Sequence, residues 1–171
     1  GLRYHWAALG AQQRWKPFIE ELAAWLGAWS APERALVLVG PSAGYSLPAA
    51  LLERFQRIRA LEPDGLARCL FERRFGPALR AQGTVLEWDR KDHLAGPEGD
   101  YAPRHVQTLL AEEPQSAVLF CNLLGQLSQQ AEDVTRRAAR QAWLRELPTW
   151  LGLHGCSWAS YHDRFSGPMP P

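Results

Sequence analysis

A short apolar run that leads directly into a turn and a helix pattern constrains this chain most. Residues 35–39 read ALVLV, residues 40–44 read GPSAG, and leucines at helical spacing follow at once. Five consecutive apolar residues are typical of a strand that is buried on both faces, as in a parallel sheet. Ser46 and Pro48 are residue types favoured at the cap and in the first turn of a helix. The stretch therefore predicts a buried strand, a tight corner and a helix.

The same alternation of strand and helix patterns recurs along the chain. It predicts strands at 36–39, 58–61, 84–88 and 117–121, with a fifth strand within 154–165. Helices are predicted at about 15–29, at 46–55, from residue 64 to a stop at residues 76–77, and at 131–147. This order predicts an α/β fold: a doubly wound, mostly parallel sheet with helices on both faces and its first strand near the middle. We expect one domain over residues 1–171, with an N-terminal helix at about 15–29 and a core at about 35–165.

Charge and cysteine content argue against several classes of protein. Nineteen Lys and Arg residues against 18 Asp and Glu residues give a net charge of +1, which does not favour binding to nucleic acid. No apolar stretch reaches the roughly 18 residues of a membrane span, so we expect no membrane partner. Three separated cysteines predict free thiols in a cytoplasm, and isolated histidines predict no metal site. The Ala-, Leu- and Arg-rich composition indicates a bacterial source.

Glycine, acidic and amide residues follow the predicted strands, one group after each strand. In parallel sheets, ligands bind beyond the carboxyl ends of the strands, so these residues are the candidates for a binding site. A carboxylate there can accept hydrogen bonds from two neighbouring ribose hydroxyls. We expect the carboxylate after the second strand to lie free at the edge of the sheet. In strand order, the candidates are Gly40, Ser42 and Gly44, then Glu62, then Asp89, then Asn122.

This ordered series resembles the class I S-adenosylmethionine-dependent methyltransferases over residues 35–127. The resemblance implies a Rossmann-like fold, S-adenosylmethionine as cofactor, and methyl transfer to an acceptor that the sequence does not identify. It implies that Gly40 and Gly44 face the methionine part of the cofactor. It also implies that Glu62 binds the ribose hydroxyls, that Asp89 contacts the adenine amino group, and that Asn122 lies beside the reactive end.

The chain departs from the family pattern in the glycine loop and at its end. The family loop often reads acid-x-Gly-x-Gly-x-Gly, but here Leu38 takes the place of the acid and Ser42 that of the middle glycine. The Gly-x-Gly-x-x-Gly motif of dinucleotide-binding proteins is absent, which disfavours a nicotinamide enzyme. The family usually adds two strands after the fifth, and this sequence has no room for them. Either the sheet is a minimal one that lacks the last strands, or the 171 residues are part of a longer protein.

A second interpretation of the same residues stays open. The glycines can merely shape a turn, and Glu62 can be a solvated acid beside a helix cap. The chain is then a non-catalytic, Rossmann-like protein that binds a partner. For catalysis, His162 and Asp163 follow the fifth predicted strand and are candidates for proton transfer, although a histidine there can equally be a packing or surface residue. The acceptor, a small molecule or a macromolecule, and the oligomeric state stay open.

Overall fold

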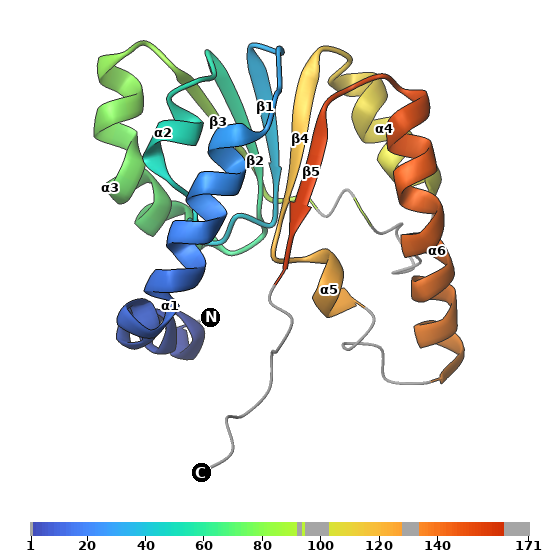
Figure 1. Ribbon diagram of the computed structural model, residues 1–171, viewed down its shortest axis with the longest axis horizontal. Coiled ribbons are helices and arrows are strands. Elements are labelled where there is room, and N and C mark those ends of the chain that lie inside the picture. The colour runs from blue at the N-terminus through green and yellow to red at the C-terminus, as the bar shows by residue number, and fades with distance from the viewer. Residues whose placement is uncertain (1, 92–93, 95–102, 128–133, 163–171) are drawn as a thin grey trace.

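A parallel sheet of five strands forms the centre of the computed structural model, which describes residues 2–91, 94, 103–127 and 134–162 (Figure 1). Its order is β3-β2-β1-β4-β5, and each neighbouring pair is parallel. The α/β fold with the first strand in the middle is therefore confirmed. The strands are β1 (Ala35–Val39), β2 (Arg57–Leu61), β3 (Val85–Asp89), β4 (Ser116–Cys121) and β5 (Trp158–Tyr161).

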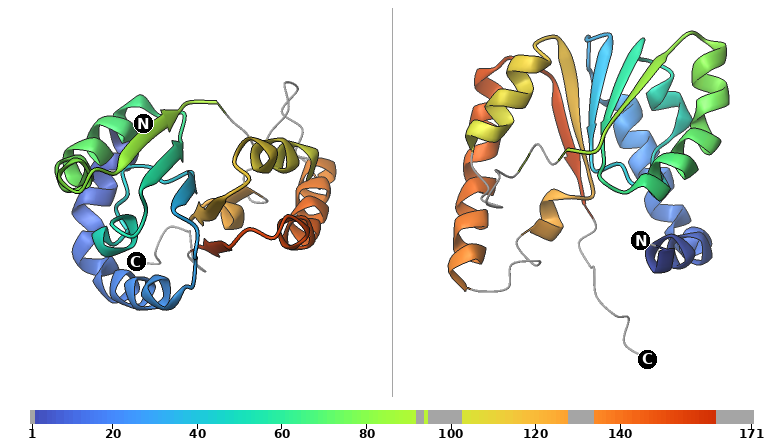
Figure 2. Two further views of the ribbon diagram at one scale, coloured as in Figure 1. Left: turned by 90° about the horizontal axis from the view of Figure 1, so that it is seen from above. Right: turned by 180° about the vertical axis from the view of Figure 1, so that it is seen from behind.

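Helices cover both faces of the sheet (Figure 2). One face carries α1 (Leu2–Ala28), α2 (Ala49–Leu52) and α3 (Gly65–Ala81), and the other carries α4 (Pro103–Glu112) and α6 (Val134–Leu153). The short helix α5 (Leu124–Leu127) follows β4. This arrangement is the doubly wound one, because the connections after β1 and β2 lie on one face and those after β3 and β4 on the other.

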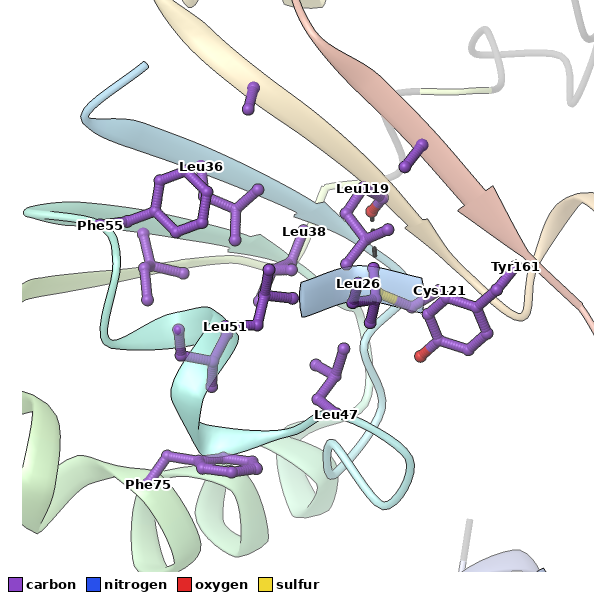
Figure 3. Close-up of a cluster of buried hydrophobic side chains, with 14 of the residues drawn as sticks. Leu26, Leu36, Leu38, Leu47, Leu51, Phe55, Phe75, Leu119, Cys121 and Tyr161 are labelled. Carbon is purple, nitrogen blue, oxygen red and sulfur yellow. Dashed lines mark hydrogen bonds between the residues drawn. The ribbon is translucent and has the colours of Figure 1, made fainter. Parts of the chain in front are cut away.

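Strand β1 supplies both halves of the core, because alternate side chains of a strand point to opposite faces. Leu36 and Leu38 pack with α1, α2 and α3, as the close-up in Figure 3 shows. Val37 and Val39 pack with α4 and α6. Leu38 is fully buried and is therefore a core residue.

Two helices differ from the sequence-based expectation in their bounds. Helix α1 begins at Leu2 rather than near residue 15. A tertiary contact helps to hold its first turns, since His5 is buried and hydrogen-bonded to Tyr45. Helix α3 does not stop at Gly76 and Pro77 but continues to Ala81. Burial of Phe75 and Leu79 on either side of Pro77 offsets the backbone hydrogen bond that proline cannot donate.

The corner after β1 also differs in detail. Helix α2 is a single turn with Pro48 at its N-cap position, and no side chain caps it. Ser46, the predicted cap, instead shares a 2.9 Å hydrogen bond between its Oγ and the hydroxyl of Tyr161 at the end of β5. The serine therefore joins the loop after β1 to the edge strand β5.

Candidate functional site at the carboxyl edge of the sheet

The strand register brings the predicted site residues to one edge of the sheet. Val39 pairs with Leu61, and Leu61 pairs with Asp89, so β1, β2 and β3 end at the same level. Val39 also pairs with Phe120 on β4, which extends one residue further, to Cys121. The strand order reverses between β1 and β4, which is the place where such sheets bind ligands.

The loop after β1 has left-handed backbone at three positions. Gly40, Ser42 and Gly44 have φ angles of 66°, 50° and 67°. The Gly40 amide donates to the carbonyl of Leu61 at 3.0 Å, which joins the loop to the end of β2. Left-handed backbone costs a residue with a Cβ atom about 1–2 kcal/mol, so Ser42 is a strained position. Strain of this kind is common at ligand-binding sites.

Gly44 is required by packing as well as by its backbone angle. A Cβ atom at this position would lie 2.6 Å from Cε2 of Phe75 and 3.0 Å from the ring of Phe71, both on α3. At Gly40 the nearest atom would be Cδ2 of Leu123 at 3.4 Å, an ordinary contact. Helix α3 therefore explains the glycine at position 44 without a ligand. Contact between Gly44 and a cofactor stays a prediction.

The carboxylate of Glu62 joins the glycine loop to the start of α3. Its Oε2 accepts from the Ser42 amide at 3.0 Å, and its Oε1 accepts from the Asp64 amide at 3.1 Å. The carboxylate is thus not free, contrary to our expectation. Each oxygen has a second lone pair, however, so two further donors can bind to this half-buried group. The backbone amide of Glu62 also donates to the carbonyl of Asp89 at 2.8 Å.

Asp89 lies beside Glu62 but is part of an ion-pair network on β2 and β3. Its Oδ2 accepts from Nη2 of Arg59 at 2.7 Å, and its Oδ1 accepts from the Lys91 amide at 2.8 Å. The hydrogen bond that Arg59 donates to Asp89 raises the pKa of Arg59 above its ordinary value, against the opposing effect of burial. The structure therefore gives Asp89 a role in holding the edge strand, and its contact with adenine stays a prediction.

The same network has a buried acid at its centre. Glu113, whose side chain is 4% exposed, accepts hydrogen bonds from Arg57, Arg59 and the hydroxyl of Ser116. Burial alone would raise the pKa of Glu113, but these hydrogen bonds outweigh it and hold the pKa below its ordinary value. Sequence analysis missed this cluster, although arginines two positions apart on a strand share one face.

Asn122 and His162 lie at the ends of β4 and β5. Asn122 has a φ angle of 50°, and its amide donates to the carbonyl of Tyr161 at 2.9 Å. His162 is exposed and lies against Gly125 of α5, where an added Cβ atom would be 3.0 Å from the Cβ of the histidine. The structure thus brings the strand-four turn and the histidine together. Asp163, its predicted neighbour, lies outside the described residues.

Cys121 is the thiol nearest this edge, and its surroundings make it unreactive. Burial raises the pKa of Cys121 to about 12, so the thiolate is not populated near neutral pH. The part of the chain that the structure describes contains no group of three His, Cys, Asp or Glu side chains that could hold a metal ion. Among the same residues, no helix has the length and apolar character needed to cross a membrane.

Comparison with known proteins gives only remote structural likenesses. No family model and no curated protein matches the sequence. The N-methyltransferase NodS from Bradyrhizobium japonicum WM9, solved with S-adenosyl-L-homocysteine, superposes with a TM-score of 0.44 at 13% identity, over 77% of this chain and 55% of NodS.

The glycopeptide N-methyltransferase MtfA gives similar values. Its complex with S-adenosyl-L-methionine superposes with a TM-score of 0.39 at 16% identity, over 75% of this chain and 47% of MtfA. Its complex with S-adenosyl-L-homocysteine gives 0.38 at 18%, over 75% and 45%. The chain therefore spans about half the length of these proteins. Its α/β architecture is established by its own strand order and register.

Proposed function

We propose that the chain binds S-adenosylmethionine at the carboxyl edge of the sheet and acts as a methyltransferase. One observation carries the proposal: the carboxylate after β2 is hydrogen-bonded to the glycine loop, and its backbone is hydrogen-bonded to the end of β3. Three of the elements that form the family resemblance are thereby joined in one place, through Ser42, Glu62 and Asp89.

The residues at this edge fit the adenosine part of the cofactor. The Glu62 carboxylate would accept hydrogen bonds from the two ribose hydroxyls, one on the second lone pair of each oxygen, because the Ser42 and Asp64 amides use only the first. Asp89 would accept from the adenine amino group in addition to its bond to Arg59. The methionine part has less support, because the buried side chain of Leu38 offers no charge to its ammonium group.

The cofactor supplies an electrophilic methyl group, so the chain has to position an acceptor and exclude water. His162 is exposed at the ends of β4 and β5, and a neutral imidazole there can take the proton from a hydroxyl or an amine. We propose His162 for this role, with Asp163 as its charged neighbour. The acceptor would be a molecule whose hydroxyl or amine group reaches this end of the sheet.

Location and organisation belong to the same proposal. We infer that the protein is cytoplasmic and bacterial and that residues 1–171 form one domain. The unpaired cysteines at 69, 121 and 156 support a reducing compartment. The two hydrophobic clusters that share β1 support a single folding unit.

A non-catalytic binding protein of the same fold is the second candidate. Two observations favour it: Leu38 is a core residue where the family has an acid, and α1 exposes aromatic side chains. Trp25 is 47% exposed and Phe18 is 37% exposed on this helix. Exposed aromatic residues are typical of surfaces that bind other proteins.

Isothermal titration calorimetry with S-adenosylmethionine and S-adenosylhomocysteine separates the two candidates. The proposal predicts that both ligands bind in the micromolar range and that NADH does not bind. A folded protein that binds neither ligand at millimolar concentration would reject the methyltransferase and favour the binding protein. Binding of NADH alone would assign the edge to a nicotinamide cofactor.

A further inference from the structure

A buried histidine in α1 is hydrogen-bonded to two residues that flank the proposed cofactor site. His5 lies in the first turns of α1 and is 3% exposed. Its Nδ1 is 2.9 Å from the hydroxyl of Tyr45, and its Nε2 is 3.3 Å from Oδ2 of Asp64. The first turns of α1 lie beyond the carboxyl ends of the strands (Figures 1 and 2). The proposed function gives His5 no role.

Tyr45 and Asp64 belong to the two segments that Glu62 joins. Tyr45 directly follows Gly44 in the glycine loop. The amide of Asp64 donates to Oε1 of Glu62, whose other oxygen holds the loop. One imidazole therefore bridges the same two segments as the proposed ribose-binding carboxylate, from the side of α1.

The hydrogen-bonding roles of the imidazole follow from its partners. An ionised Asp64 only accepts, so Nε2 of His5 carries the proton and donates to it. In the neutral imidazole Nδ1 then accepts from the hydroxyl of Tyr45. Asp64 uses its other oxygen, Oδ1, to accept from the Leu66 amide at 2.9 Å and so caps α3. Each polar atom named here has a partner, which makes the contact specific in orientation.

We propose that His5 is a positioning residue that docks the first turns of α1 onto the cofactor site and holds the glycine loop and Glu62 in their binding geometry. The part of this inference that concerns ligand affinity rests on the proposed function. Coupling between two sites is reciprocal, so a ligand that binds better when α1 is docked also stabilises the docked helix by the same factor. Cofactor binding is therefore expected to protect the first turns of α1.

The test combines S-adenosylhomocysteine calorimetry with hydrogen–deuterium exchange on the intact chain. The variant His5→Ala removes the bridge, and Trp6→Ala, at a neighbouring position that is 75% exposed, is the matched control. His5→Ala is expected to weaken S-adenosylhomocysteine binding by roughly tenfold, because it leaves the hydroxyl of Tyr45 and the Asp64 carboxylate without this partner. Trp6→Ala is expected to bind like the parent.

Exchange shows where the effect of His5→Ala lies. It is expected to accelerate in residues 2–16 and 40–46, while residues 117–121 of β4 stay protected. Tyr45→Phe combined with His5→Ala is expected to cost less than the sum of the two single changes, since each removes the same hydrogen bond between His5 and Tyr45. His5→Gln, which can keep a donor toward Asp64, is expected to restore part of the affinity.

Two results would overturn the inference. One is a His5→Ala variant whose affinity and exchange in residues 40–46 match those of Trp6→Ala. The other is an increase in exchange that includes β4, which would make His5 a general stabilising residue. If the parent binds no S-adenosylhomocysteine, the proposed function fails by itself. The exchange in residues 40–46 then still decides whether His5 holds the loop.

Discussion

Replacing Glu62 by glutamine tests whether this side chain holds the loop as well as the ligand. Both carboxylate oxygens accept from backbone amides, of Ser42 and of Asp64. Glutamine keeps one acceptor oxygen but places an NH2 group where the second oxygen stood. One of the two backbone N–H groups would then face another donor, whichever way the amide is turned. The substitution therefore breaks one loop contact even before a ligand is considered.

The expected cost follows from the burial of this contact. An N–H group left without a partner costs about 1–3 kcal/mol when it is buried. Glu62 is only half-buried, so water can reach the freed group and the lower end, about 1 kcal/mol, applies. For a chain of this size that corresponds to a decrease in Tm of about 2–4 °C. A free carboxylate, as the sequence alone suggested, would have given almost no change.

The assay is thermal and urea unfolding of Glu62→Gln beside a matched surface variant, Glu72→Gln. Glu72 forms an exposed 2.7 Å pair with Arg68 on α3, and such pairs contribute little, so its loss should change stability by less than about 0.5 kcal/mol. Glu62→Gln should also weaken S-adenosylhomocysteine binding, whereas Glu72→Gln should not. Equal unfolding curves for the two variants would show that Glu62 does not hold the loop, and the reasoning from its two amide contacts would be refuted.

Three further perturbations address the network, the loop and the thiols. The pKa of Glu113 is held below its ordinary value of 4.5, so near this pH the unfolded chain binds more protons than the folded chain. The free energy of unfolding should therefore decrease as the pH falls below about 5. Glu113→Gln should flatten this pH dependence in urea unfolding at pH 3–7. Gly44→Ala should destabilise the fold by about 1–3 kcal/mol, because the backbone has a φ angle of 67° and the added Cβ atom would meet the phenyl rings of α3. In the same urea assay Gly27→Ala, where an added Cβ atom meets nothing within 4 Å, should stabilise the fold by about 0.5–1 kcal/mol. In native protein a thiol reagent should modify exposed Cys69 much faster than buried Cys121, as peptide mass spectrometry would measure.

Each of these expectations has a contradicting result. An acid limb that is identical in the parent and in Glu113→Gln would remove that carboxylate from the pH dependence. Equal stabilities of the two glycine variants would mean that the left-handed turn and the phenyl rings of α3 impose no constraint. Modification of Cys121 at the rate of Cys69 would show that the end of β4 opens readily.

The architecture could be predicted because short strands carry a strong local signal. The run at 35–39 is buried on both faces and occupies the centre of the sheet, as five consecutive apolar residues indicate. The helix predicted from residue 64 does begin there, and the Asp64 side chain caps it by accepting from the Leu66 amide. The positions after the strands followed in turn, because parallel strands place their carboxyl ends at one edge.

The contacts within the site were beyond the reach of sequence patterns. His5 and Asp64 are 59 positions apart, and Ser46 and Tyr161 are 115 apart, so no local periodicity relates them. The engagement of Glu62 by two backbone amides depends on the path of the loop rather than on any side chain. Likewise, Pro77 predicts a helix stop because the local cost of proline is visible in the sequence, whereas the burial of Phe75 and Leu79 that offsets this cost is not.

The central claim is that the carboxyl edge of the sheet binds S-adenosylmethionine through Glu62. A crystal structure of the chain grown with S-adenosylhomocysteine tests it most directly. The account predicts the ribose hydroxyls within hydrogen-bond distance of the Glu62 carboxylate, the adenine beside Asp89, and the amides of Ser42 and Asp64 still bound to Glu62. Ligand bound elsewhere, or no ligand at millimolar concentration in crystals that leave this edge open, would contradict it.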